Sequence, residues 1–128
     1  MIILGIDPGT TSIGYAVIQS EHKKPRLLCA DILKCTRGRL PHELLKDVHI
    51  SLQNIIEKWR PDALAIEKLF FAKNVKTALA VSEMRGVILL TAALARLIVS
   101  EYTPLEVKMV ITSDGRADKR QQPFAAVA

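Results

Sequence analysis

Alternating apolar and polar positions near the N-terminus predict three β-strands, over residues 2–7, 12–19 and 26–35. A Pro-Gly turn separates the first two strands, and the polar stretch SEHKKP separates the second from the third. Because short turns join neighbouring antiparallel strands, we expect these three strands to form a meander.

From residue 40 the apolar period changes to that of a helix. Seven apolar residues recur at steps of three, four and one over residues 40–61: Leu44, Leu45, Val48, Leu52, Ile55, Ile56 and Trp59. Pro61 is expected to end this helix, because proline cannot donate a backbone hydrogen bond. His42 and His49 have no second ligand at metal spacing, so we expect both on the solvated face.

The next segments predict a strand over residues 63–70 and a long, alanine-rich helix over residues 75–98. Gly86 lies inside that helix, where glycine costs about 1 kcal/mol relative to alanine, so we expect a packing reason such as another helix close by. Residues 99–103 read as a fifth strand, and Pro104 can open a further short helix. This order of elements predicts an α/β domain with a mixed sheet.

The length of 128 residues fits one domain, and a composition that is 49% hydrophobic and 24% charged is that of a soluble globular protein. The N-terminal apolar run is interrupted too early for a signal peptide, and no uninterrupted apolar stretch has the length of a membrane span. We therefore expect a cytoplasmic protein with no membrane partner.

Cys29 and Cys35 would lie roughly 20 Å apart on one strand, which predicts reduced thiols. The net charge of +5 fits either simple solubility or a polyanionic partner.

Two carboxylates lie on predicted strands. Asp7 closes the first strand, on the same face as Gly5, and Glu67 shares a face with Ala65 on the fourth strand. If these strands are parallel neighbours, their backbones lie about 4.8 Å apart and both carboxylates can bind one divalent cation. Asp7 alone could simply initiate the Pro-Gly turn. The two acids together favour a metal site.

The stretch EKLFFAKNVK follows the second carboxylate. Its basic side chains Lys68, Lys73 and Lys76 surround two phenylalanines, and Asn74 is the expected N-cap of the long helix. Lysines can follow phosphates while an aromatic ring stacks on or wedges between bases. The alternative is an ordinary solvated loop with one core phenylalanine. Since alternation cannot bury Phe70 and Phe71 on one side, we expect at least one to be exposed.

Four blocks of the sequence resemble, in order, those of the RuvC-type Holliday junction resolvases: ILGIDPGTTSIGYAVI, RPDALAIEKLFFAKNVKTAL, RGVILLTAALARLIVSEYTPLEVKMVIT and GRADKRQ. The resemblance runs from residue 1 to about residue 121. It implies a single ribonuclease H-like nuclease domain over residues 1–128, with a mixed five-stranded sheet flanked by helices. It also implies a homodimer that binds four-way junctions and nicks two strands symmetrically in recombination and repair, with two Mg²⁺ or Mn²⁺ ions per site and helicase partners for branch migration. The helix with Gly86 resembles the family's dimer helix.

The resemblance assigns roles to individual residues. Asp7 and Glu67 match the first two acidic metal ligands, and Lys108 and Lys119 match basic residues close to the scissile phosphate. Phe70 matches the aromatic residue inserted at the junction crossover. The candidate DNA-binding set is Phe70 with Lys68, Lys73, Asn74, Lys76 and Arg116.

The sequence departs from the family after residue 119. Related proteins continue into a helix with the remaining acidic ligands, in a pattern like His-x-x-Asp-Ala, whereas this sequence reads KRQQPFAAVA and has no Asp or Glu after Asp118. Asp114 and Asp118 fall at variable positions and are not substitutes. We therefore expect a C-terminal truncation, very weak or absent cleavage by this chain alone and partly retained junction binding.

Three other functions fit parts of the sequence. A catalytically inactive junction-binding module differs from a resolvase only at the C-terminus. A YqgF-type ribonuclease H-like RNA nuclease shares the Asp-x-Gly-Thr start, but Pro8 and the FFAKN stretch argue against it. The opening block also resembles the phosphate loop of actin-like kinases and chaperones, which need two such domains and far more residues.

Overall fold

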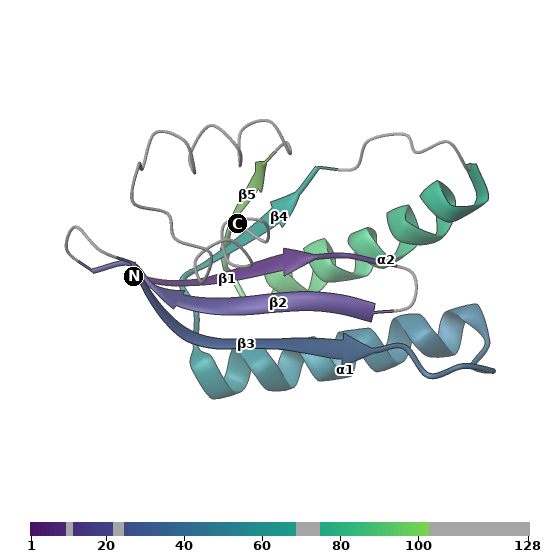
Figure 1. Cartoon of the computed structure of the whole chain (residues 1–128), viewed down its shortest axis with the longest axis horizontal. Helices are drawn as coiled ribbons and strands as arrows, with labels where there is room; N and C mark the ends of the chain where they lie inside the picture. The colour runs from purple at the N-terminus through teal and green to yellow at the C-terminus, as the bar shows by residue number, and fades with distance from the viewer. Residues whose placement is uncertain (10–11, 22–24, 69–74, 103–128) are drawn as a thin grey trace.

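The computed structural model describes residues 1–9, 12–21, 25–68 and 75–102 (Figure 1). Five strands and two helices occur in this part of the chain. In chain order they are β1 (Ile2–Asp7), β2 (Ser12–Gln19), β3 (Arg26–Lys34), α1 (Pro41–Trp59), β4 (Ala63–Glu67), α2 (Val75–Leu94) and β5 (Ile98–Tyr102).

The strands form one mixed sheet in the order β3-β2-β1-β4-β5. β1, β2 and β3 pair antiparallel, which confirms the predicted meander. β4 pairs parallel with β1 on one side and with β5 on the other. The connections through α1 and α2 are the crossovers that parallel neighbours require. The predicted α/β class with a mixed sheet is confirmed.

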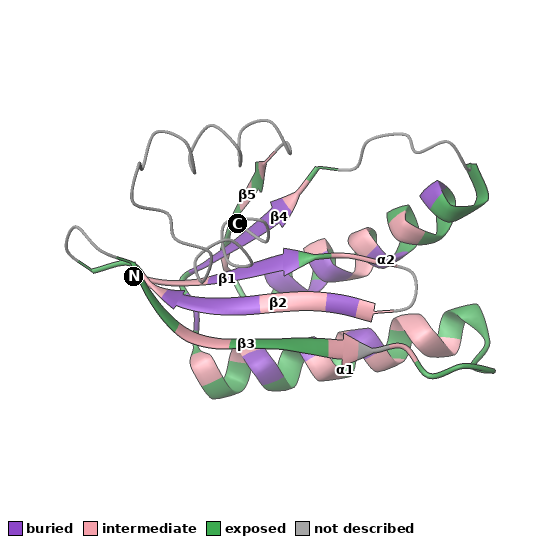
Figure 2. Cartoon of the chain, viewed as in Figure 1, coloured by how far each residue is buried: buried purple, intermediate pink, exposed green. Residues whose placement is uncertain are grey.

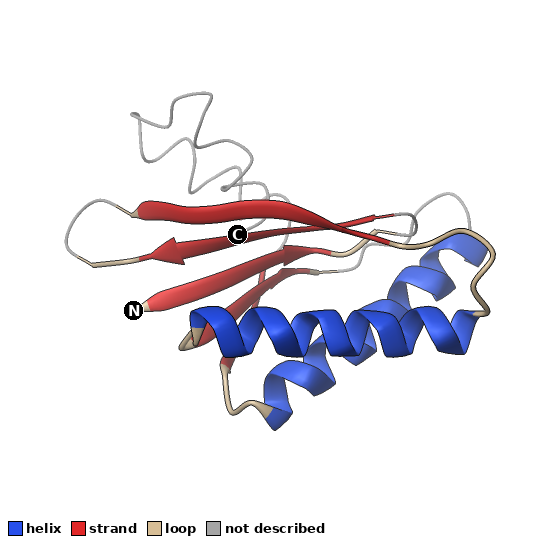
Figure 3. Cartoon of the chain, turned by 90° about the horizontal axis from the view of Figure 1, so that it is seen from below, coloured by secondary structure: helices blue, strands red, loops and turns tan. Residues whose placement is uncertain are grey.

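Both helices pack against the same face of the sheet (Figure 3). Alternate residues of the central strands, among them Leu4, Ile6, Leu64 and Ile66, are fully buried and form the core with residues of α1 and α2. Buried positions are concentrated on β1, β2 and β4, whereas the edge strand β3 is largely exposed (Figure 2). The core therefore lies against the central strands, and β1 and β4, whose carboxyl ends carry Asp7 and Glu67, are two of them.

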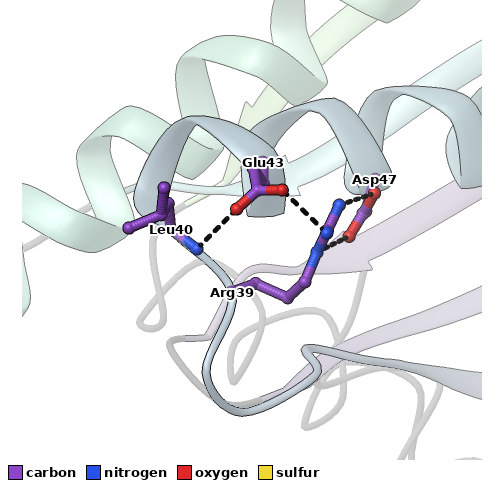
Figure 4. Close-up of polar contacts among 4 residues, drawn as sticks. All are labelled: Arg39, Leu40, Glu43 and Asp47. Carbon is purple, nitrogen blue, oxygen red and sulfur yellow. Dashed lines mark hydrogen bonds and ion pairs between the residues drawn. The ribbon is translucent and has the colours of Figure 1, made fainter.

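The start of α1 is held by charged side chains (Figure 4). The Arg39 guanidinium forms ion pairs with Glu43 at 2.8 Å and with Asp47 at 3.0 Å. Glu43 also accepts a hydrogen bond from the backbone N–H of Leu40 at 3.2 Å, which satisfies a donor that the helix cannot pair internally. Arg60 in the left-handed conformation ends α1, immediately before Pro61 as predicted.

The end of α2 and the strand boundaries correct the sequence analysis. The predicted helix over 75–98 stops at Leu94, because Arg96 adopts a left-handed conformation (φ 61°) and the N–H of Leu97 bonds the carbonyl of Ala92 at 3.0 Å. The left-handed residue that ends a helix in this way is usually glycine, so nothing in the sequence indicated that α2 would end here. The third strand ends at Lys34 rather than at residue 35, and the fourth ends at Glu67.

Three further predictions have outcomes in the fold. Cys29 and Cys35 are free thiols, as expected. Gly86 is exposed, and a Cβ built on it meets nothing within 4 Å among the described residues, so the expected helix neighbour is not found in this part of the chain. His49 is not on a solvated face: it is partly buried, and its Nδ1 lies 2.7 Å from Thr91 Oγ1 on α2. His42 is exposed, as expected.

The helix α2 is also long and apolar enough to cross a membrane, judged by length and composition only. The helix of a protein core passes the same test, and α2 contributes Met84, Ile88 and Ala92 to the core against α1 and the sheet. Its other side exposes Leu79, Leu90 and Leu94.

Candidate metal centre

The two candidate metal ligands end adjacent parallel strands. The paired register of β1 and β4 runs to Ile6 opposite Ile66, so Asp7 and Glu67 are the next residue on each strand. Residues opposite one another in parallel strands point to the same face, and the strands lie about 4.8 Å apart. The structure therefore brings together the two carboxylates that the sequence analysis selected.

Small residues adjoin the two carboxylates on their face of the sheet. Leu4 and Ile6 point into the core beneath the helices, so alternation places Asp7 on the opposite face with Gly5. Ala65 pairs with Gly5 and lies on the same face as Glu67. Neither position carries a side chain larger than a methyl group, which leaves room beside the carboxylates for an ion and its other ligands.

The electrostatics of the pair favour a cation. Burial raises the pKa of the Asp7 carboxyl, which loses part of its hydration although the residue as a whole is exposed. Burial, and secondarily the negative charge of Asp7, raises the pKa of the partly buried Glu67. Neither carboxylate forms a salt bridge within the described residues. Two uncompensated like charges are costly in apo protein, and a divalent cation removes that cost.

The donor set fits magnesium or manganese bound together with a substrate. No group of three or more His, Cys, Asp or Glu side chains that could hold a metal occurs in the part of the chain that the structure describes. Mg²⁺ is commonly held by one or two carboxylates, with water and substrate phosphates completing its shell. Asp7 and Glu67 can therefore supply the protein side of such a shell.

The backbone after Glu67 is held by an arginine that the sequence analysis missed. Arg85 on α2 donates from Nε to the carbonyl oxygen of Glu67 at 3.3 Å, and its Nη2 lies 3.2 Å from Oε1 of Glu101 on β5. Positions 67, 85 and 101 come together only through the crossover from β4 to β5, so no local pattern could have indicated the contact.

The other candidate residues are only partly covered by the structure. Lys68 follows β4 and is exposed, and its backbone N–H donates to the carbonyl of Tyr102 at 2.6 Å. Lys76 lies exposed in the first turn of α2. The remaining site predictions lie outside the described residues: Phe70, Lys73, Asn74, Lys108, Arg116 and Lys119.

Comparison with known proteins gives one consistent result. A family model described as "Crossover junction endodeoxyribonuclease RuvC" matches residues 3–126. The chain is 46% identical over 121 residues to the protein of that name from Moorella thermoacetica, covering 94% of this chain and 72% of the relative. It is likewise 46% identical over 121 residues to the one from Halothermothrix orenii, covering 94% and 73%.

Solved structures of similar proteins share the fold. The structure entitled "T. thermophilus RuvC in complex with Holliday junction substrate" superposes with a TM-score of 0.80 at 29% identity, covering 88% of this chain and 71% of the other. "Thermus thermophilus RuvC structure" gives a TM-score of 0.81 at 30% identity, covering 98% and 77%. A yeast mitochondrial Holliday junction resolvase, at 17% identity and a TM-score of 0.70, shares the fold alone.

Proposed function

Because the chain belongs to the RuvC family of crossover junction endodeoxyribonucleases, we propose that it binds four-way DNA junctions and nicks two strands by metal-dependent phosphodiester hydrolysis. The adjacent Asp7 and Glu67 at the carboxyl ends of β1 and β4 carry this proposal. Their uncompensated charges, with raised pKa values, suit a divalent cation bound beside a DNA phosphate.

In this proposal Asp7 and Glu67 hold Mg²⁺ or Mn²⁺, two ions in the complete site. The bound ions would supply an activated water and would stabilise the leaving oxygen. Asp7 and Glu67 would fix where the scissile phosphate sits relative to the central strands β1 and β4. Lys108 and Lys119 are proposed to stabilise the negative charge on the reacting phosphate, and their position is carried over from the family resemblance alone.

The proposed DNA surface follows β4 into α2. Lys68 and Lys76 are exposed there, at the two ends of the segment that carries Phe70, Lys73 and Asn74. We propose that the lysines contact phosphates, that Phe70 stacks or wedges at the crossover, and that Arg116 adds a further phosphate contact. The net charge of +5 supports a polyanionic partner.

We further propose that the protein acts as a cytoplasmic homodimer with branch-migration helicases as partners. A four-way junction has two equivalent strands to nick, and a two-fold dimer offers two equivalent sites. The exposed apolar side chains Leu79, Leu90 and Leu94 and the uncovered Gly86 make α2 the candidate dimer helix.

A junction-binding module without cleavage is the second candidate. It is favoured by the fact that the described residues supply two carboxylates and no third ligand. The chain spans about three quarters of the length of the relatives it matches.

The test uses the 128-residue chain with a fluorescent four-way junction, a linear duplex and a duplex RNA of equal length. We expect tighter binding to the junction than to either competitor in EDTA, and weak nicking with Mg²⁺ or Mn²⁺ that Asp7→Asn and Glu67→Gln abolish. Glu57→Gln, which removes an exposed carboxylate from α1, is the matched control and should behave like the parent.

The outcomes separate the candidates. Equal affinity for junction and linear duplex would refute junction recognition, and a preference for RNA would favour the RNA nuclease. Junction selectivity without nicking in any metal would support the binding module. Nicking that survives Glu67→Gln would exclude Glu67 as a metal ligand.

A further inference from the structure

Arg85 lies where α2 meets the ends of β4 and β5, and its side chain is only 14% exposed. We propose that Arg85 is a positioning residue that sets the direction of the Glu67 side chain by holding the peptide group that follows Glu67. This inference rests on the proposed metal site, because it gives Arg85 a role only if Glu67 is a ligand.

The peptide group between Glu67 and Lys68 is held at both of its polar atoms. Its carbonyl oxygen accepts from Arg85 Nε at 3.3 Å, and its N–H donates to the Tyr102 carbonyl on β5 at 2.6 Å. A trans peptide group is planar, and its C=O and N–H point in opposite directions. Two anchors on opposite edges therefore fix the plane, and with it the backbone torsion that follows the Cα of Glu67.

Arg85 acts where the sheet no longer supplies support from β1. The β1–β4 pairing ends at Ile6 opposite Ile66, whereas β5 continues to pair with Glu67 through Tyr102. The carbonyl of Glu67 is thus at the end of the ladder, and Arg85 provides the donor there. Without this donor, the carbonyl side of the peptide group between Glu67 and Lys68 would not be held, and that peptide group could rotate.

The charge of Arg85 is directed at Glu101 rather than at the Glu67 carboxylate. Nη2 lies 3.2 Å from Oε1 of Glu101, which is 39% exposed. Within the described residues the guanidinium contacts the carbonyl oxygen of Glu67 and the carboxylate of Glu101, and forms no ion pair with the Glu67 carboxylate. Arg85 therefore orients Glu67 through the backbone and leaves its carboxylate available to a cation.

The geometry requires arginine in particular. Nε and Nη2 belong to one planar group: Nε donates to the Glu67 carbonyl on β4, while Nη2 forms an ion pair with Glu101 on β5 that lacks hydrogen-bond geometry. Lysine has one ammonium on a flexible chain, so it can keep the ion pair with Glu101 but cannot also hold the Glu67 carbonyl in a fixed geometry. Arg85→Lys therefore separates the positioning role from the charge.

The experiment measures Mn²⁺ binding to the 128-residue protein by the EPR signal of free Mn²⁺, with NMR hydrogen exchange at the Lys68 amide as a second readout. The variants are Arg85→Lys, Arg85→Met and Glu67→Gln. Ile88→Val is the matched control, because it removes one methyl group from the fully buried packing of α2 on the core and changes neither Arg85 nor Glu67.

We expect Arg85→Lys and Arg85→Met to raise the Kd for Mn²⁺ about tenfold or more, which is typical for groups that orient a metal ligand. Exchange at the Lys68 amide should accelerate in both variants. Ile88→Val should leave the Kd for Mn²⁺ within about twofold of the parent, because a general loss of packing does not move Glu67.

Parent-like Mn²⁺ affinity in Arg85→Lys, with binding lost in Glu67→Gln, overturns the positioning role and leaves the metal site standing. Arg85→Lys decides the question if Arg85→Met fails to fold. An equal loss in Ile88→Val and in Arg85→Lys also overturns it, since stability alone would then explain both. Parent-like binding in Glu67→Gln refutes the metal site itself.

Discussion

The repulsion between Asp7 and Glu67 predicts that removing either charge stabilises the metal-free protein. The carboxylates project from strands about 4.8 Å apart, and at that separation two unit charges repel by about 0.9 kcal/mol in water and about 3.5 kcal/mol at an effective dielectric of 20. Because Asp7 is exposed, the lower figure applies. We expect Asp7→Asn and Glu67→Gln each to raise the free energy of unfolding by about 1 kcal/mol at pH 7, or Tm by about 4 °C for a chain of this size.

The double variant makes the prediction specific to the pair. Once Asp7 is neutral, Glu67 has lost its repulsive neighbour, so Glu67→Gln should add much less in the Asp7→Asn background than alone. The assay is urea unfolding in EDTA at low ionic strength, for the parent, both single variants and the double variant. Adding Mn²⁺ should stabilise the parent and leave the double variant unchanged.

The contribution of Asp7 and Glu67 to the free energy of unfolding depends on pH with a fixed sign. Both pKa values are raised by folding, so ionisation of these carboxyls opposes the folded state. Their contribution to stability is most favourable below the unfolded pKa, near 4, and is lost as the pH rises through the raised folded pKa. The gain from Asp7→Asn should therefore shrink as the pH falls and approach zero below about pH 4. Strictly additive single variants, or a destabilising Asp7→Asn at pH 7 without metal, would refute this account.

The glycines and the contact between the helices give two further predictions. A Cβ on Gly9 would lie 2.5 Å from the backbone oxygen of Ser12, so Gly9→Ala should lower the free energy of unfolding by about 1–3 kcal/mol. Gly86→Ala should instead raise the free energy of unfolding of the monomer by about 1 kcal/mol. Thermal unfolding of both variants checks this, and equal effects would contradict it. Thr91→Val removes the buried hydroxyl that contacts His49 and should cost about 1–3 kcal/mol in urea unfolding, while a neutral effect would show that the contact adds nothing.

The sheet and its carboxylates were predictable because their determinants are local. Period-two alternation defines the strands, and the helix before the fourth strand allows that strand to return as a parallel neighbour of the first, so the sequence could pair Asp7 with Glu67 on that condition. The class of fold and the antiparallel meander followed in the same way.

The errors arose where distant parts of the chain meet. His49 was assigned to the solvated face because no second metal ligand stands at a suitable spacing, but the side chain of Thr91 on α2 supplies its partner. Arg85 carried no signal because its contacts lie on β4 and β5. The end of α2 was misplaced because Arg96 takes a conformation that usually marks glycine.

The contact between Thr91 and His49 also determines where the imidazole proton lies. The Thr91 hydroxyl has one hydrogen, and it donates that hydrogen to the Val87 carbonyl at 2.7 Å. It can therefore only accept from His49, whose Nδ1, 2.7 Å away, must carry a proton. The hydrogen bond therefore runs from His49 on α1 to Thr91 on α2, and its direction is set by the Val87 carbonyl, which takes the only hydrogen of the hydroxyl.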